Sequence, residues 1–363
     1  MPKNLFDKLR FSVVVFGCFL GISSQAFADI VLEYHTPTPD SSPADLALDG
    51  RGNIWFTEIN ANRIGMLDPT KAKSLTSEGI TEYELPNPNS RPYFLTVAKN
   101  GMIWFTEGGN RIGSLDPKTG KIKEYDIPSP HSEPHQIAEG QDGTIWFLEF
   151  HTNKIGRLDP LSGKITEFPV GSGNPHALVL VGNKVWYTQG GMYWVNIFFN
   201  KLGSMDIKTG NVEETIIPPE KSVPHGLAAA KDGTIWLTEM FASKLGKLDL
   251  KQKKSKIQEY HLGGERKPHG ISFDEKRGYV WFTAANPFAI GSLDLSQAKP
   301  GTGQGVKYYN LPDPNSRPTQ ILVDENGNVW FTEMGEYFQG KFNNKIGLLV
   351  PCEGKLCLDK NTR

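Results

Sequence analysis

Four of the chain's eight histidines occupy one repeated position, directly after a proline; they are His135, His176, His225 and His269. Carboxylates recur 14 residues beyond this position in five repeats, at Glu58, Glu107, Glu149, Glu239 and Glu333. Imidazole supplies a base near neutral pH, and clustered carboxylates attract a hard divalent cation. The two residue types at this spacing indicate proton-transfer chemistry assisted by a metal ion.

The elements that position these residues are marked by seven tryptophan phrases spaced 40 to 50 residues apart. The phrases are IWFTE (Trp55), IWFTE (Trp104), IWFLE (Trp146), VWYTQ (Trp186), IWLTE (Trp236), VWFTA (Trp281) and VWFTE (Trp330). Self-similarity at this period is typical of an array of identical supersecondary units. Each unit contains four short strand-like segments separated by turns such as Asp142-Gly143, which predicts an all-β, seven-bladed β-propeller.

The two ends of the chain predict how the ring closes. The segment Ile30 to Tyr34 resembles the fourth-strand phrases of other repeats, whereas the last repeat stops at its third strand, Lys345 to Val350. We therefore expect the N-terminal strand to complete the last blade. This closure removes two free sheet edges, which open β-sheets must otherwise protect.

First strands line the central channel of a propeller, so the position after the proline should face that channel. Around the ring it holds Ala44, Tyr93, His135, His176, His225, His269 and Thr319. The end of each second strand holds Glu58, Glu107, Glu149, Gln189, Glu239, Ala284 and Glu333. A hairpin brings the two positions nearly opposite each other, so we expect both sets at one channel mouth. The alternative is that each repeated glutamate is structural and binds the backbone of the next blade.

The third repeat differs from the others because Glu133 precedes Pro134 and His135. With Glu149, this repeat offers two carboxylates flanking one imidazole, an arrangement suited to a metal ion and a base. Two long loops should leave from the same mouth, one carrying Tyr193 and Trp194 and the other Tyr337. Aromatic loops over a polar channel favour a lid for a bulky ligand, or alternatively a patch for a protein partner. The predicted ligand contacts are His225, His269, Glu107, Glu239, Tyr193, Trp194 and Tyr337.

Composition limits the remaining possibilities. With 39 basic and 40 acidic residues and no basic stripe, nucleic acid is not an expected partner. Residues 1–28 resemble a secretory signal peptide, with a basic start, an apolar stretch and a cleavage signal at Ala26-Phe27-Ala28. This predicts a periplasmic or secreted protein with one propeller over residues 29–363, monomeric and without a stable membrane anchor. The alternative is a lipoprotein signal ending at Cys18.

The chain retains two cysteines after the predicted cleavage, Cys352 and Cys357. In an oxidising compartment this short pair predicts a disulfide that fixes the C-terminal tail, the alternative being two free thiols. One such pair without a second pair or a nearby histidine is a poor metal site.

The phrase PHGLAAAKDGTIWLTE, followed by strands of the NKIGRLDP type, resembles the streptogramin B lyases, also called virginiamycin B lyases, over the whole mature chain. The resemblance implies a seven-bladed propeller that linearises a cyclic depsipeptide by eliminating its ester. It also implies that Glu133 and Glu149 hold Mg²⁺ and that His135 transfers a proton. The family's second histidine belongs to the preceding blade, where this chain has Tyr93; the neighbouring histidine is His176.

Three functions are consistent with these observations. The first is a lyase-like metal enzyme acting on a cyclic ester, depsipeptide or related compound. His135 would be its base, and His176 or Tyr93 would protonate the leaving oxygen. The second is a periplasmic lactonase-type hydrolase with a bound divalent ion. The third is a non-catalytic propeller that binds a ligand or a protein.

Overall fold

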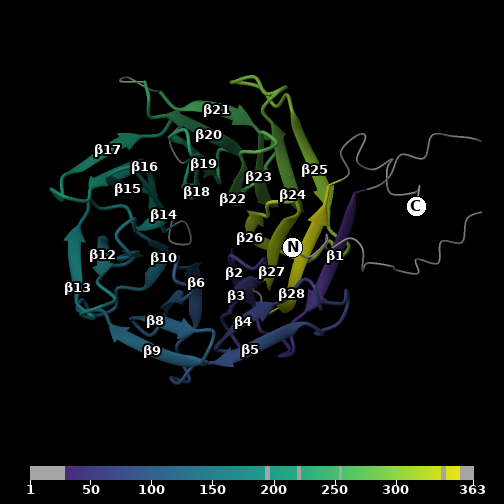
Figure 1. The fold of residues 1–363 in the computed structure, drawn as a ribbon. Helices are drawn as coiled ribbons and strands as arrows, with labels where there is room; N and C mark the ends of the chain where they lie inside the picture. The colour runs from purple at the N-terminus through teal and green to yellow at the C-terminus, as the bar shows by residue number, and fades with distance from the viewer. Residues whose placement is uncertain (1–28, 193–196, 219–221, 253–255, 337–340, 352–363) are drawn as a thin grey trace, which may run out of the picture.

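The computed structural model describes residues 29–192, 197–218, 222–252, 256–336 and 341–351. Over these residues the chain forms seven four-stranded antiparallel sheets, arranged as blades around a channel (Figure 1). The described residues include no helix, and so none long and apolar enough to cross a membrane. The predicted all-β, seven-bladed propeller is therefore confirmed.

Each blade runs from an inner strand beside the channel to an outer strand at the rim. In that order the strands of the seven blades are β2 (Pro43–Leu48), β3 (Ile54–Glu58), β4 (Arg63–Leu67) and β5 (Ile80–Glu84); β6 (Pro92–Val97), β7 (Ile103–Glu107), β8 (Arg111–Asp116) and β9 (Lys121–Asp126); β10 (Pro134–Glu139), β11 (Ile145–Glu149), β12 (Lys154–Leu158) and β13 (Ile165–Pro169); β14 (Pro175–Val181), β15 (Lys184–Met192), β16 (Ile197–Asp206) and β17 (Val212–Ile216); β18 (Pro224–Ala229), β19 (Thr234–Glu239), β20 (Lys244–Asp249) and β21 (Gln258–His261); β22 (Pro268–Asp274), β23 (Tyr279–Ala285), β24 (Phe288–Asp294) and β25 (Val306–Asn310); β26 (Pro318–Val323), β27 (Val329–Glu336), β28 (Lys341–Val350) and β1 (Ile30–His35).

The apolar residues of the repeated phrases pack between neighbouring blades. Trp55 in β3 is 2% exposed and packs with Phe105 of the next blade, while its ring stacks on Tyr83 in β5 at 5.7 Å between centroids. The glycine of each third strand has a separate role. A β-carbon on Gly156 would overlap the ring of Phe147 in the adjacent strand, so the glycine makes room for the aromatic residue.

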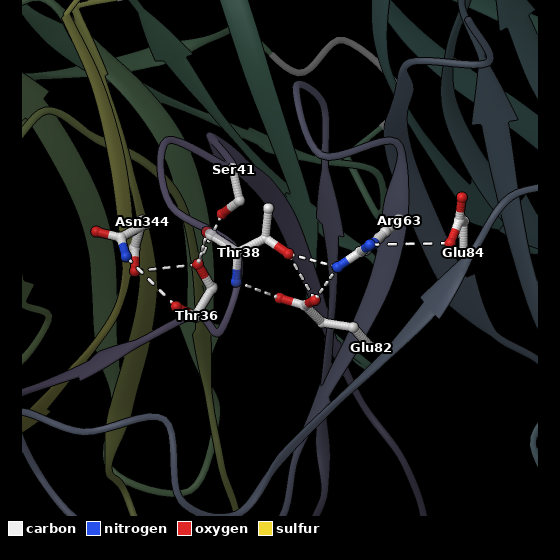
Figure 2. A network of polar contacts seen from close by, with 7 residues as sticks. All are labelled: Thr36, Thr38, Ser41, Arg63, Glu82, Glu84 and Asn344. Atoms are coloured by element: carbon white, nitrogen blue, oxygen red, sulfur yellow. Dashed lines mark hydrogen bonds and ion pairs between the residues drawn. The ribbon is translucent and has the colours of Figure 1, made fainter. Parts of the chain in front are cut away.

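The ring closes as the sequence predicts. Strand β1 pairs antiparallel with β28 from Ile30 opposite Val350 to His35 opposite Lys345, and the two strands lie side by side in Figure 1. The loop after β1 is also fixed, as Figure 2 shows. The backbone N–H and hydroxyl of Thr38 donate to Glu82 in β5 at 2.9 and 2.7 Å. Backbone pairing thus completes the last blade, and the bonds from Thr38 to Glu82 join it to the first.

Several predictions fall on parts of the chain outside the described residues. These are the signal peptide over residues 1–28, the lid residues Tyr193, Trp194 and Tyr337, and the pair Cys352 and Cys357. They stay predictions.

Candidate functional site

A cavity of about 720 Å³ opens at one mouth of the channel. Its lining includes every residue that follows the proline of a first strand, namely Ala44, Tyr93, His135, His176, His225, His269 and Thr319. The volume is within the range of pockets that hold small organic ligands. The structure therefore brings together the predicted channel residues of all seven blades.

The four histidines and Tyr93 form a continuous arc of rings along the wall of this cavity. Tyr93 stacks on His135 with 5.7 Å between ring centroids, and His135 meets His176 edge to face at 4.8 Å. His176 and His225 are 3.8 Å apart, as are His225 and His269. Neighbouring imidazoles at this spacing repel each other when protonated, so the arc favours neutral rings.

The pKa values of the four histidines also favour neutral rings. Burial lowers the pKa of His176 to about 4. Burial, followed by the charges of neighbouring residues, holds the pKa values of His135, His225 and His269 well below the usual value. At neutral pH all four are therefore neutral imidazoles, each with one nitrogen able to accept a proton.

A β-bulge places each ring in the cavity. In all seven blades the register of the first and second strands shifts just after the opening proline, as between Pro134 and Ile137. In six blades the threonine of the tryptophan phrase accepts a backbone hydrogen bond at this bulge, whereas blade three has Leu148 at that position. The hydroxyl of Thr238 accepts from the N–H of Gly226 and donates to the carbonyl of His269 in the next blade, both at 2.8 Å. One threonine thus positions two neighbouring histidine-bearing backbones.

Blade three adds an aromatic ring beneath His135 and a contact between a carboxylate and an imidazole at the mouth. The ring of Phe150, which is fully buried, stacks on His135 at 4.5 Å with 14° between the planes. The carboxylate of Glu133 lies 2.8 Å from Nδ1 of His151, and both residues line the cavity. The loop that carries Glu133 is held by Asn110, whose side-chain oxygen accepts from the N–H of Ser132 at 2.7 Å.

The residues that close the second strands are buried inside the blades and are not part of the cavity wall. Glu58, Glu107, Glu149, Gln189, Glu239, Ala284 and Glu333 are all fully buried, and none lines the cavity. Glu149 accepts from the hydroxyl of Thr152 at 2.7 Å. It pairs across the sheet with Lys154 in β12, whose ammonium lies 3.1 Å from Glu167 in β13. Glu149 therefore belongs to an acid–base–acid group inside the blade.

The same group recurs around the ring. Glu107 is 3.3 Å from Arg111, and Glu239 lies opposite Lys244, which is 2.7 Å from Glu259. In blade one the corresponding pair is Arg63 with Glu82 (Figure 2). Burial raises the pKa of Glu149 to about 7 and, with the nearby Glu259 charge, that of Glu239 to about 8. The repetition supports the structural interpretation of these glutamates.

The residues expected to hold Mg²⁺ do not form an assembled metal site. Glu133 lines the cavity, whereas Glu149 is buried with Lys154 and Glu167. Among the residues that the structure describes, no three His, Cys, Asp or Glu side chains are grouped so as to hold a metal ion. The Mg²⁺ site that the family resemblance implies at Glu133 and Glu149 stays a prediction.

The sequence interpretation did not include several cavity residues. Arg91, His131, His151 and Arg317 line the cavity, and Phe150 supports His135. Arg91 and Arg317 directly precede the prolines that open their blades, as Glu133 does. Aligning that position across all repeats, rather than within blade three alone, would have identified both arginines.

The fold is a seven-bladed propeller with a cavity at its channel mouth, and comparisons with known proteins specify the family. A sequence model of the Virginiamycin B lyase family matches residues 22–196 and 136–339. Because these matches span most of the chain, the protein belongs to this family.

Solved structures of virginiamycin B lyases resemble this chain in sequence and in fold. Virginiamycin B lyase from Staphylococcus aureus is 28% identical, with a TM-score of 0.75, over 90% of this chain and 100% of that one. A catalytically inactive form of the Staphylococcus aureus lyase, in a structure with quinupristin, is 29% identical over 90% of this chain and 100% of that one. Its TM-score is also 0.75. The virginiamycin B lyase of Bacillus licheniformis is 51% identical over 35 residues, which are 10% of this chain and 12% of that relative. This match therefore covers about an eighth of the length of the Bacillus licheniformis protein.

Proposed function

We propose that this protein is a lyase-like enzyme that binds a cyclic ester or depsipeptide in the channel cavity and opens its ring by carbon–oxygen elimination. The observation that carries the proposal is the arc of four neutral histidines and Tyr93 in one cavity of about 720 Å³. A structural core has no need of four adjacent imidazoles, since buried polar groups cost free energy without partners.

In the proposed reaction His135 takes the proton α to a carbonyl of the bound ligand. The electron pair of that C–H bond forms a carbon–carbon double bond as the C–O bond of the ester breaks. The proton that His135 takes is passed to the departing oxygen through His176 or Tyr93, which flank His135, so that all side chains return to their starting state. Phe150 holds the His135 ring in one orientation by stacking. The lyase resemblance implies Mg²⁺, which would polarise the carbonyl when bound.

Quinupristin, which occurs with a relative in a solved structure, is a direct probe. Elimination gives an open-chain product of unchanged mass with a new near-ultraviolet absorbance. A lactonase-type hydrolase instead gives a product heavier by one water, and a binding propeller gives no product. We expect elimination, and we expect His135→Ala to slow it by at least ~100-fold. His261→Ala, in the outer strand β21, is the control, and unchanged melting temperatures would show that both variants fold.

The predicted signal peptide would place this activity in the periplasm or outside the cell. Fractionation of cells that express the full chain tests this placement. A mature N-terminus at Asp29 in the periplasmic fraction is the expected result.

A further inference from the structure

The cavity wall carries an excess of positive charge. Of the described residues that line it, Arg91 and Arg317 are cationic, and Glu133 is the one carboxylate. Glu133 is already engaged, because its Oε2 lies 2.8 Å from Nδ1 of His151. The elimination mechanism proposed above assigns no task to either arginine. The wall is therefore complementary to a negatively charged ligand group.

Arg317 lies on the same side of the cavity as the last two histidines of the arc. Burial lowers the pKa of His269, and the charge of Arg317 lowers it further; the same charge contributes at His225. The guanidinium is thus within electrostatic range of both rings, whose centroids are 3.8 Å apart. All three residues line the same cavity, and His269 and Arg317 come from adjacent blades.

The surroundings of the His269 ring also indicate a place for a ligand group. Its side chain is only 9% exposed, and its Nε2 atom is buried without a hydrogen-bond partner among the described residues. A buried polar atom without a partner costs roughly 1–3 kcal/mol. A ligand group that hydrogen-bonds to this nitrogen would remove that cost, and His269 lines the cavity where such a group would enter.

We propose that the cavity contains a carboxylate subsite formed by the guanidinium of Arg317 and the imidazoles of His269 and His225. A guanidinium matches the planar, two-oxygen geometry of a carboxylate, and a neutral imidazole donates one N–H bond to it. The natural ligand is then a compound with a free carboxylate. This inference rests on the proposed function for the location of the ligand, but it concerns recognition and not the reaction.

The test uses two probes of nearly equal shape, N-acetylphenylalanine and N-acetylphenylalanine amide, titrated calorimetrically into the full-length protein at pH 7. We expect the acid to bind at least tenfold more tightly than the amide. Arg317→Gln should abolish this preference. Arg91→Gln is the matched control, since it removes an equal charge from the corresponding position of blade two and should keep most of the preference. Melting temperatures confirm folding of both variants.

Equal binding of acid and amide to the parent protein would overturn the proposal. Equal losses in the two variants would also overturn it, because the preference would then come from the overall charge of the cavity. The result is separable from the proposed function. If the protein prefers the acid but does not turn over quinupristin, the subsite is supported and the lyase activity is contradicted. If it turns over quinupristin but does not prefer the acid, the lyase activity is supported and the subsite is contradicted.

Discussion

Two rings of residues, 14 positions apart in five repeats, have opposite surroundings in this propeller. The residues after the opening prolines line a cavity and are histidine in four consecutive blades. The residues that close the second strands are fully buried and are glutamate in five blades, each beside a lysine or arginine of the third strand. Both rings repeat one residue type, so the surroundings, and not the repetition, separate the structural ring from the candidate site.

Blade six provides a natural test of the structural ring, because it lacks the acid–base–acid group. Ala284 and Ala289 face each other across β23 and β24, and both are almost completely buried. Ala284→Glu would bury a carboxylate without a cation, and we expect a loss of about 4 kcal/mol in the free energy of unfolding. Adding Ala289→Lys should restore more than about 1 kcal/mol. Urea unfolding of both variants measures this; an Ala284→Glu protein as stable as the parent would contradict it.

The reverse change removes the cation from an existing group. Lys154→Met leaves Glu149 and Glu167 together in blade three, and breaking such a buried pair should cost about 3 kcal/mol. The exposed pair of Lys231 with Glu275 is the control, and Lys231→Met should change stability by less than about 0.5 kcal/mol. Equal urea midpoints for the two variants would show that the buried groups add nothing to stability.

The buried glutamates also predict a dependence on pH. Burial raises the pKa of Glu239 from 4.5 to about 8, so its proton is retained in the folded state and lost in the unfolded state between these values. Stability should therefore fall as pH rises through this window. The histidines have lowered pKa values and act in the opposite sense, as pH falls below 6.5.

Urea unfolding of the parent and Glu239→Gln proteins at pH 7 and pH 8 isolates the glutamate effect, because the histidines contribute equally in both proteins. We expect Glu239→Gln to lose about 1 kcal/mol less stability than the parent between these pH values. Glu84→Gln, at an exposed carboxylate, should behave as the parent does. Parallel losses in all three proteins would contradict the assigned pKa.

The repeat predicts the blade number, the ring closure and the seven cavity positions because each depends on spacing alone. It does not predict that Glu149 and His135 face different surroundings, because a bulge after Pro134 changes which side each residue faces. A two-residue alternation cannot show such a bulge. The cation beside each glutamate was readable in principle, since Lys154 or its equivalent directly precedes the Ile-Gly or Leu-Gly pair of every third strand except that of blade six.

The smallest expected effect concerns Mg²⁺, and it compares two members of the buried ring. The family resemblance implies that Glu133 and Glu149 share a cation, whereas Glu58 occupies the position of Glu149 in blade one, with Arg63 beside it. Because both glutamates are buried in similar groups, we expect millimolar MgCl₂ to shift the melting temperature by less than about 2 °C, which corresponds to ~1 kcal/mol or less. The shift should be equal in the parent, Glu58→Gln and Glu149→Gln proteins. A larger stabilisation that Glu58→Gln keeps and Glu149→Gln loses would show that Glu149 leaves Lys154 to bind the cation, and that the buried ring of this blade is part of the active site.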